Sequence, residues 1–323
     1  MKIDRLSAGT ACAALLFVLS GCSGEADLSA VRAEQAKSIQ RSDVVQTIAA
    51  RGSHLAAGTQ SGAVLLSDDA GRHWTRHALG RPFASSIIDM AACPDGRFLA
   101  LDFYGRVWSS NASAKNWMEH QLKNPQTGLT ITCDKAGVWW VAGTYANIAK
   151  SVDQGQTWQV VDLKKDAQIT TLRWIDEKQG VAAGEFGLLL KTEDGGATWR
   201  EMPQITPDFY AYDVLFTDEK TGWISGVAGQ LYQTLDGGKT WRLKENKTAS
   251  PLYRLFLHGG NPYAVGARGV IARLDGDVWN AVDYANAVPV FLGGGASVEG
   301  AENAIIIGGP GGLLRSVSAS AKQ

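Results

Sequence analysis

The chain has 323 residues, of which 45% are hydrophobic and 20% are charged, and this composition excludes a disordered polymer. Its formal net charge of −1 provides no basic excess to neutralise phosphates, so no nucleic-acid partner is expected. The 37 glycines and 11 tryptophans, beside only 9 prolines, favour many short strands joined by tight turns.

The first 21 residues have the form of an export signal. Lys2 and Arg5 precede an apolar run over residues 8–18, which is too short to span a membrane. The signal ends in Leu19-Ser-Gly-Cys22, which resembles the lipobox of bacterial lipoproteins and implies cleavage before Cys22 and lipidation of that residue. Two or more acyl chains anchor a protein stably to a membrane. The alternative is an ordinary signal peptide that is cut nearby, with Cys22 incidental.

The residue after the lipobox cysteine indicates in which membrane a bacterial lipoprotein is anchored. By the rules for Gram-negative lipoproteins, Ser23 implies the periplasmic side of the outer membrane. Residues 22–40 are polar and rich in alanine, so we expect a lipidated tether. The pattern then changes, which predicts one folded domain over residues 41–318 and a short tail over residues 319–323.

A motif of Ser or Thr, Asp, Gly and Trp returns every forty-odd residues along this domain. The clear copies are Thr234–Trp241, Thr192–Trp199 and Ser151–Trp158, and Ser67–Trp74 is a looser one. Before each motif come an apolar strand, a small-residue strand ending in a glycine-bounded hairpin, and a third strand. A more polar fourth strand follows the Trp. Four short strands in about forty residues is the size of a propeller blade.

The tryptophans that end these motifs mark six blades: Trp74, Trp117, Trp158, Trp199, Trp241 and Trp279. A seventh, partial unit runs over residues 291–316 and has three strands without a fourth. An open sheet edge invites aggregation, so we expect the segment before Val44 to supply the missing strand. The predicted fold is an all-β, seven-bladed β-propeller of four-stranded antiparallel blades, closed by an N-terminal strand. Six or eight blades are the alternatives.

The repeated motif is predicted to fix a turn. Its Asp accepts hydrogen bonds from backbone N–H groups, its Gly residues permit positive φ, and its Trp packs over the loop. The residues with these roles are Asp69, Asp153, Asp194 and Asp236, with Trp74, Trp158, Trp199 and Trp241. One carboxylate per turn provides too few oxygen ligands for calcium, so we expect no metal and no cofactor.

The motif resembles the Asp-box, or bacterial neuraminidase repeat. A longer frame, Gly-x-x-Gly-x-Leu/Ile-x-x-Thr/Ser-x-Asp-Gly-Gly-x-Thr-Trp, covers Gly184–Trp199 and Gly226–Trp241. It is similar to the frame of the photosystem II assembly and stability factor family. The resemblance covers residues 44–317 and implies a seven-bladed propeller that acts as a non-enzymatic assembly factor for a membrane complex.

The resemblance also bears on the partner. Photosynthetic members of the family carry a basic patch on one face, built from several blades. The arginines available for such a patch in this chain are Arg268, Arg254, Arg173 and Arg106, and Asp213 stands one blade earlier at the place of Arg254. This departure predicts a protein partner other than photosystem II.

Sialidases share the Asp-box, so a glycan-hydrolysing or glycan-binding propeller is the rival hypothesis. Sialidases carry their first arginine in an Arg-Ile-Pro element, to which Arg81-Pro-Phe is the nearest match here. Paired carboxylates serve other glycosidases, and Asp102 and Glu185 are the candidates for such a pair. Both are predicted in hairpin turns, where a carboxylate is usually a solvent-exposed charge without a catalytic role. We therefore expect no enzyme.

Successive turns of a four-stranded blade alternate between the two faces of the disc. The Asp motifs therefore share one face, and the glycine-bounded hairpins share the other. Consecutive hairpins carry Tyr104, Tyr145 and Phe186 at comparable places, with Arg268 and Arg254 nearby. Exposed aromatic residues beside arginine are typical of interface centres. We expect a monomer that binds a protein on this face. The alternative is that the rings turn inward and plug the channel.

Cys93 and Cys133 fall at similar points of neighbouring repeats. An oxidising compartment would permit a disulfide between them, but two separate buried thiols are the expectation from sequence.

Overall fold

The computed structural model describes residues 27–80, 82–298 and 304–318, so the predicted signal and Cys22 lie outside the described residues. The chain divides into two units, residues 1–36 and residues 37–323. The described part of the first unit contains one helix, α1 (Ser29–Gln35), within the predicted tether. No helix among the described residues has the length and apolar character that crossing a membrane requires.

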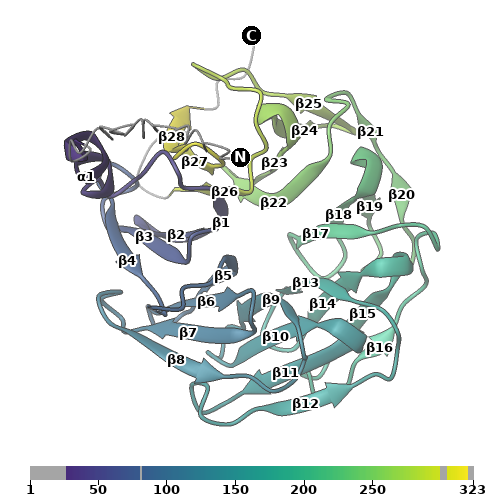
Figure 1. Cartoon of the computed structure of the whole chain (residues 1–323). Coiled ribbons are helices and arrows are strands. Elements are labelled where there is room, and N and C mark those ends of the chain that lie inside the picture. Colours follow the sequence, from purple (N-terminus) through teal and green to yellow (C-terminus); the bar gives the residue numbers. More distant parts are fainter. Residues whose placement is uncertain (1–26, 81, 299–303, 319–323) are drawn as a thin grey trace, which may run out of the picture. The chain divides into compact units, whose positions relative to one another are not determined.

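The second unit is a ring of seven sheets around a central channel (Figure 1). Blade 1 contains β1 (Val45–Arg51), β2 (His54–Thr59), β3 (Ala63–Ser67) and β4 (Thr75–Ala78). Blade 2 contains β5 (Ile87–Ala92), β6 (Phe98–Asp102), β7 (Arg106–Ser110) and β8 (Trp117–Gln121). Blade 3 contains β9 (Gly128–Cys133), β10 (Trp139–Gly143), β11 (Asn147–Ser151) and β12 (Gln159–Asp162). Blade 4 contains β13 (Ile169–Trp174), β14 (Gly180–Gly184), β15 (Leu189–Thr192) and β16 (Arg200–Glu201).

The remaining blades complete the ring. Blade 5 contains β17 (Ala211–Phe216), β18 (Gly222–Gly226), β19 (Leu231–Thr234) and β20 (Arg242–Leu243). Blade 6 contains β22 (Leu252–His258), β23 (Asn261–Gly266), β24 (Ile271–Asp275) and β25 (Val278–Ala281), and β21 (Glu245–Asn246) adds a fifth, parallel strand outside β25. Blade 7 contains β26 (Gly294–Ser297), β27 (Ala304–Gly308) and β28 (Leu314–Ser318).

The prediction of a seven-bladed propeller with four-stranded antiparallel blades is confirmed, since five of the seven sheets have four strands in simple antiparallel order. The first strand of each blade lines the channel, and the fourth lies at the outer rim. The second strands from blade 2 to blade 5 are buried along their whole length, as is β27. This burial explains their small and apolar sequences, because neighbouring blades pack on both faces of each sheet.

The predicted closing strand is wrong. The segment before β1 does meet blade 7, where Val45 N donates to Gly309 O (3.0 Å) and Gly312 N donates to Asp43 O (2.9 Å). Among the described residues, however, residues 37–44 contain no strand. The Asp43 carboxylate accepts hydrogen bonds from Gln40 N and Arg76 Nη1, both at 2.8 Å. These bonds hold the segment in a turn, so it cannot extend along the open edge of β28.

Aromatic side chains fill the gaps between blades. Trp140, Trp174 and Trp199 form one such cluster between blades 3 and 4, with ring centroids 5.0–6.4 Å apart. Large rings in tilted and edge-on contact contribute much of the apolar area that a blade interface buries. The Trp that ends each motif therefore also joins its blade to a neighbour.

Cys93 and Cys133 form a disulfide, with their Cα atoms 5.3 Å apart. The expectation of two separate thiols is therefore wrong. Cys133 ends β9 and Cys93 directly follows β5, and these strands line the channel side by side in neighbouring blades. Cys93 stands one residue further along its repeat than Cys133 does, and the two adjacent strand ends bring the sulfurs together.

Removing this disulfide should lower stability. The bond closes a loop across a sequence separation of 40 residues, for which the unfolded-chain entropy predicts a loss of about 2–4 kcal/mol. Thermal unfolding with and without a reductant should show a fall of roughly 5–10 °C. The double variant Cys93→Ala/Cys133→Ala should have the lower melting temperature in both conditions. A reductant effect that persists in this variant would contradict the account.

Candidate partner-binding face

The Asp turns lie on one face of the disc, and each is held by a set of local hydrogen bonds. In blade 4, Asp194 Oδ1 accepts from Thr192 Oγ1 (2.8 Å) and from Thr198 N (2.9 Å), while Oδ2 accepts from Thr198 Oγ1 (2.6 Å). Gly196 N donates to Thr192 Oγ1 (2.8 Å). The turns around Asp153 and Asp236 repeat these bonds, and Asp69 accepts from the N–H and the ring of His73 instead.

These bonds stabilise the charged form of each carboxylate. The side-chain hydroxyl of the motif Thr is the largest contribution, followed by its backbone N–H, and together they lower the pKa of Asp153, Asp194 and Asp236 to about 2. The hydrogen bonds from His73 likewise lower the pKa of Asp69. Each carboxylate is occupied by its own turn. Among the described residues, no cluster of three or more His, Cys, Asp or Glu side chains is placed to hold a metal.

The glycine-bounded hairpins form the opposite face and share one backbone geometry. They are the short turns η1 (Thr144–Ala146), η2 (Glu185–Gly187), η3 (Val227–Gly229) and η4 (Ala267–Gly269). The central residue of each has a positive φ between 56° and 57°, and these residues are Tyr145, Phe186, Ala228 and Arg268. This left-handed conformation is costly for a residue other than glycine, so the surrounding structure must enforce it.

Backbone bonds enforce this conformation. The first N–H of each hairpin donates to the loop that enters the same blade, and the acceptors are Thr127 O, Gln168 O, Tyr210 O and Pro251 O, at 2.9–3.1 Å. The central side chain consequently points away from the blade. The loop and the backbone conformation therefore decide which side chains the hairpin face presents.

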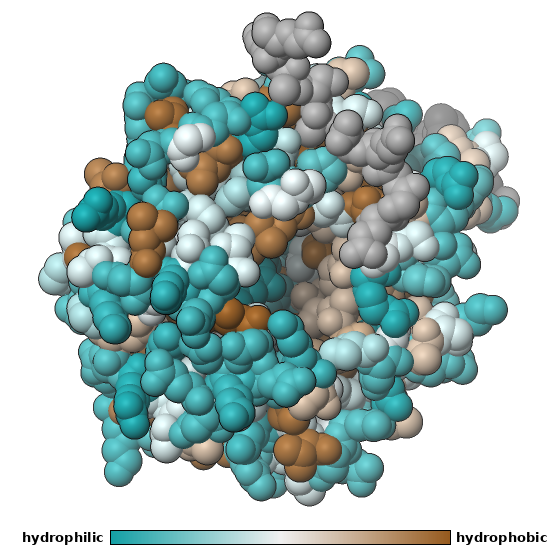
Figure 2. All heavy atoms as spheres, turned by 180° about the vertical axis from the view of Figure 1, so that it is seen from behind, coloured by the Kyte–Doolittle hydropathy of each residue, from teal (hydrophilic) through white to brown (hydrophobic). Residues whose placement is uncertain are grey.

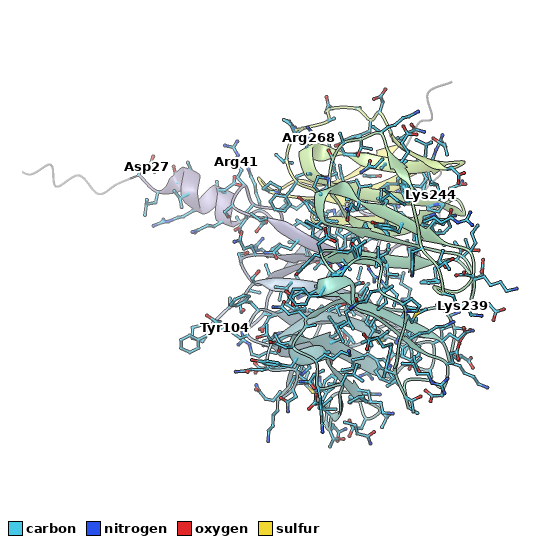
Figure 3. The ribbon with its side chains drawn as sticks, turned by 90° about the vertical axis from the view of Figure 1, so that its right-hand side faces the viewer. Asp27, Arg41, Tyr104, Lys239, Lys244 and Arg268 are labelled. Atoms are coloured by element: carbon cyan, nitrogen blue, oxygen red, sulfur yellow. A yellow bond between two sulfur atoms is a disulfide. The ribbon has the colours of Figure 1, made fainter. Side chains whose placement is uncertain are left out.

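The aromatic residues of this face are exposed. Tyr104 is 72% exposed, Tyr145 is 56% and Phe186 is 57% exposed, so these rings do not fold into the channel. Phe103 and Phe83 are exposed as well. We call these five residues the aromatic arc. Tyr104 and Arg268 project from the same side of the disc in Figure 3, and Lys239 and Lys244 lie on the opposite side.

Sequence reasoning missed Phe83, because it lies in the loop between blades 1 and 2, outside the repeating pattern. Its carbonyl oxygen accepts a hydrogen bond from Arg106 Nη2 (3.0 Å). The Asp-turn face differs in character from the arc. It is largely hydrophilic, with a hollow at its centre (Figure 2), and its exposed apolar side chains include Val152 and Leu235.

The four arginines proposed for a basic patch lie in different places, and each has its own partner. Arg268 Nη2 donates to Ala249 O (2.6 Å) and to Ser250 Oγ (2.9 Å) on the neighbouring loop. Arg106 Nε donates to the buried carboxylate of Asp102 at 2.6 Å. Arg173 and Arg254 lie at the channel and pair with carboxylates there.

The channel contains a network of two buried aspartates. Asp213 accepts hydrogen bonds from Thr171 Oγ1 (2.9 Å), from the guanidinium of Arg173 (3.0 and 3.2 Å) and from Leu255 N (3.0 Å). Burial is the largest effect on the pKa of Asp213 and raises it, but the charges of Arg173 and Arg254 and these hydrogen bonds outweigh it, so the pKa is lowered overall. The negative charge of Asp213 in turn raises the pKa of Arg173.

Asp89 forms the second centre of this network. It accepts from Thr47 Oγ1 (3.3 Å), Thr130 Oγ1 (2.9 Å) and Ile131 N (3.0 Å). Arg254 Nη2, which comes from blade 6, reaches Asp89 in blade 2 at 3.1 Å. Sequence reasoning did not find this network. The available signal was positional, because all of its side chains except that of Arg173 stand at one place in successive first strands: Thr47, Asp89, Thr130, Thr171, Asp213 and Arg254.

A cavity of about 540 Å³ lies beside this network, and its lining includes Tyr212, Tyr253, Arg254 and Phe291. The rings of Tyr212 and Tyr253 meet edge to face, with centroids 5.3 Å apart. Gln60, from the hairpin of blade 1, also lines the cavity, so it adjoins the hairpin face. It combines aromatic walls with a guanidinium, which suits a polar peptide segment.

Acid should abolish the contribution that the Asp turns make to the stability of the fold. A carboxylate whose folded pKa of about 2 lies below its ordinary value of 3.8 stabilises the fold above that ordinary value, and this stability is lost as the pH falls towards 2. The triple variant Asp153→Asn/Asp194→Asn/Asp236→Asn should therefore melt below the wild type at pH 6. The difference in melting temperature between the variant and the wild type should disappear as the pH falls from about 4 to about 2. A gap that is independent of pH would refute this assignment.

Replacing Asp213 should destabilise the ring. The variant Asp213→Asn removes the buried counter-charge of Arg173, whose side chain is 37% exposed, and leaves buried hydrogen-bond partners less well satisfied, which costs about 1–3 kcal/mol. Urea unfolding measures the change, and Asp208→Asn, at an exposed acidic residue, is the matched control with an expected change within about 0.5 kcal/mol. Equal stability of the two variants would mean that the network does not stabilise the fold.

Known proteins with similar sequences belong to a family of photosystem II assembly factors. The model of the family described as photosynthesis system II assembly factor YCF48 matches residues 109–206 and 200–275, more than half of the chain. A photosystem II assembly lipoprotein Ycf48 from Synechococcus sp. (strain CC9605) is 32% identical over 164 residues, which is 48% of each chain. The chain thus spans about half the length of the curated relatives that it matches most extensively.

Solved structures show the fold alone, since their sequence identity is low. A YCF48 bound to a D1 peptide has a TM-score of 0.60 at 15% identity, covering 73% of this chain and 78% of its own. A virginiamycin B lyase from Staphylococcus aureus has a TM-score of 0.73 at 11% identity, covering 86% of this chain and 96% of its own. The family model decides the assignment: the chain belongs to the family of the photosystem II assembly factor YCF48.

Proposed function

We propose that this chain is a lipid-anchored, monomeric and non-enzymatic scaffold that binds a protein partner during the assembly of a membrane complex. The aromatic arc carries this proposal. Family membership supports the assembly role, and one solved relative is a YCF48 bound to a D1 peptide. The partner in this case is a protein other than photosystem II.

The exposed rings are not needed by the fold. Ala228 adopts the same left-handed conformation as Tyr145 and Phe186, so the hairpin accepts a small side chain at this place. Aromatic side chains bury a large apolar area at low conformational cost, and interface centres are enriched in them. Five exposed rings on one face therefore support a docking surface for a protein.

The arginines support a partner different from that of the photosynthetic relatives. Arg254 and Arg173 are neutralised within the channel by Asp89 and Asp213, and Arg106 pairs with Asp102. The charges of these three side chains are consequently balanced inside the chain. Aromatic contact, rather than a basic patch, is then the main source of affinity.

The candidate carboxylates of a hydrolase are already occupied. Asp102 accepts hydrogen bonds from Tyr104 N, from the N–H groups of Arg106 and from Trp108 Nε1, so it supports the hairpin of blade 2. Glu185 Oε2 accepts from Gln168 N at 2.9 Å. Both side chains therefore have structural partners, which supports a scaffold rather than a glycan-hydrolysing enzyme.

The proposed location is the periplasmic side of the outer membrane, with Cys22 as the lipidated residue. The disulfide between Cys93 and Cys133 supports an exported protein, because disulfides persist in oxidising compartments. The sequence Leu19-Ser-Gly-Cys22 and the following Ser23 support the anchor and the choice of membrane.

The aromatic arc can be tested by substitution. The triple variant Tyr104→Ala/Tyr145→Ala/Phe186→Ala should lose the protein that co-purifies with the wild type after crosslinking in the native envelope. Its melting temperature should stay within about 2 °C of the wild type, since these side chains are exposed.

The matched control is Val152→Ala/Leu235→Ala, which removes exposed apolar side chains from the Asp-turn face. This double variant should retain the partner. If the triple variant retains the partner and the control loses it, the hairpin face is not the binding face.

A further inference from the structure

The outer edge of blade 7 differs from that of the other blades. In blades 1 to 6 the third strand is covered on its outer side by an antiparallel fourth strand, and these fourth strands are β4, β8, β12, β16, β20 and β25. Within the described residues, β28 pairs only with β27. An uncovered strand edge presents backbone N–H and C=O groups that can pair with another chain.

The register of the other blades shows which groups β28 presents. In blades 4, 5 and 6, an N–H at the fourth strand donates to the first carbonyl of the third strand. These bonds join Met202 N to Leu189 O, Lys244 N to Leu231 O and Val282 N to Ile271 O, at 2.8–2.9 Å.

Leu314 holds the corresponding place in blade 7. Gly309 N donates to Leu313 O as Gly266 N donates to Val270 O, and Leu314 pairs with Gly308 as Ile271 pairs with Val265. Peptide groups alternate in direction along a strand, so those of Leu314, Ser316 and Ser318 point to the open edge, and those of Arg315 and Val317 point towards β27.

A groove of about 540 Å³ runs along this edge, between residues 283–286 and residues 315–318. Its outer wall is fixed in place. Arg315 Nη2 donates to Ala285 O (3.1 Å) and to Asn286 O, and Tyr284 OH donates to Gly269 O, at the end of the blade 6 hairpin. This wall lies close to β28, so the groove suits a single extended chain rather than a second propeller.

We propose that this groove binds an extended segment of a partner protein, which adds to β28 as the antiparallel fourth strand of blade 7. The fourth strands of the other six blades show what kind of segment pairs with such an edge. The native fourth strands β4 and β12 have four residues each and are largely exposed, so the segment needs about four residues, no proline and mainly polar side chains. This site is separate from the aromatic arc and does not depend on it.

Hydrogen exchange in the full chain tests whether the edge is open. The amides of Ser316 and Ser318 should exchange much faster than the amide of Arg273, which faces a fourth strand at the register of Ser316. Equally slow exchange would mean that the chain's own residues or a second copy already cover β28, and this result would overturn the proposal.

Peptide binding tests the addition of the strand. The probe is a fluorescent peptide with the sequence of residues 277–283, Asp-Val-Trp-Asn-Ala-Val-Asp, which contains the fourth strand of blade 6. The peptide should bind the full chain and slow the exchange of the Ser316 and Ser318 amides. Substituting Pro for its central Asn removes the N–H that would pair with Ser316, because Asn280 pairs with Arg273 in blade 6, so affinity should fall by about tenfold or more.

Variants of the protein provide the matched comparison. Ser316→Pro removes an outward N–H while leaving the bonds to β27, and it should weaken binding as the proline peptide does. Ser316→Thr keeps the backbone donor and should bind within about twofold of the wild type. The proline peptide tests the same bond even if Ser316→Pro fails to fold. No binding of the parent peptide, or equal binding of the proline peptide, would overturn the proposal.

Discussion

Two buried carboxylates hold the ring together at the channel. Asp213 in blade 5 accepts hydrogen bonds from Thr171 in the preceding blade and from the Leu255 N–H in the following one. Asp89 in blade 2 does the same with Thr47 and Thr130. A charge removed from water is costly unless it is paired, so each carboxylate requires the neighbours that surround it. The contact of Arg254 with Asp89 then connects blade 6 to blade 2 across the channel.

This arrangement separates the structural charges from the proposed binding surface. The Asp turns occupy their own carboxylates, and the channel neutralises Arg173 and Arg254. In the hairpins of blades 3 and 4, the exposed rings of Tyr145 and Phe186 are held in an outward direction by a left-handed backbone.

The repeat made much of the fold predictable from sequence. The spacing of the motif tryptophans predicted the number of blades, and the alternation of turns predicted that the Asp motifs and hairpins lie on opposite faces. The hairpin positions of Tyr104, Tyr145 and Phe186 followed from the same register. Their exposure did not. At Tyr145 and Phe186 it depends on a positive φ of the hairpin and on the loop that holds it, and in the hairpin of Tyr104 the positive φ is at Gly105.

Features that depend on contacts between blades were not predictable. The pairing of Cys93 with Cys133 requires the distance between first strands of adjacent blades, which a single repeat does not contain. Arg254 resembled a surface residue in sequence, because its partner Asp89 lies 165 residues away. The turn at Asp43 depends on Arg76 of blade 1, so the failure of the closing strand also came from a contact distant in sequence.

We propose that the hairpin face, and not the Asp-turn face, contacts the partner. Photo-crosslinking residues placed singly at Phe103, Tyr145, Val152 and Leu235, in the native envelope, distinguish the two faces. The first two positions lie in the hairpins and the last two in the Asp turns, and all four side chains are exposed. We expect one common adduct from Phe103 and Tyr145 and none from Val152 or Leu235. An adduct confined to the Asp-turn positions would show that the hairpin face is not the binding face.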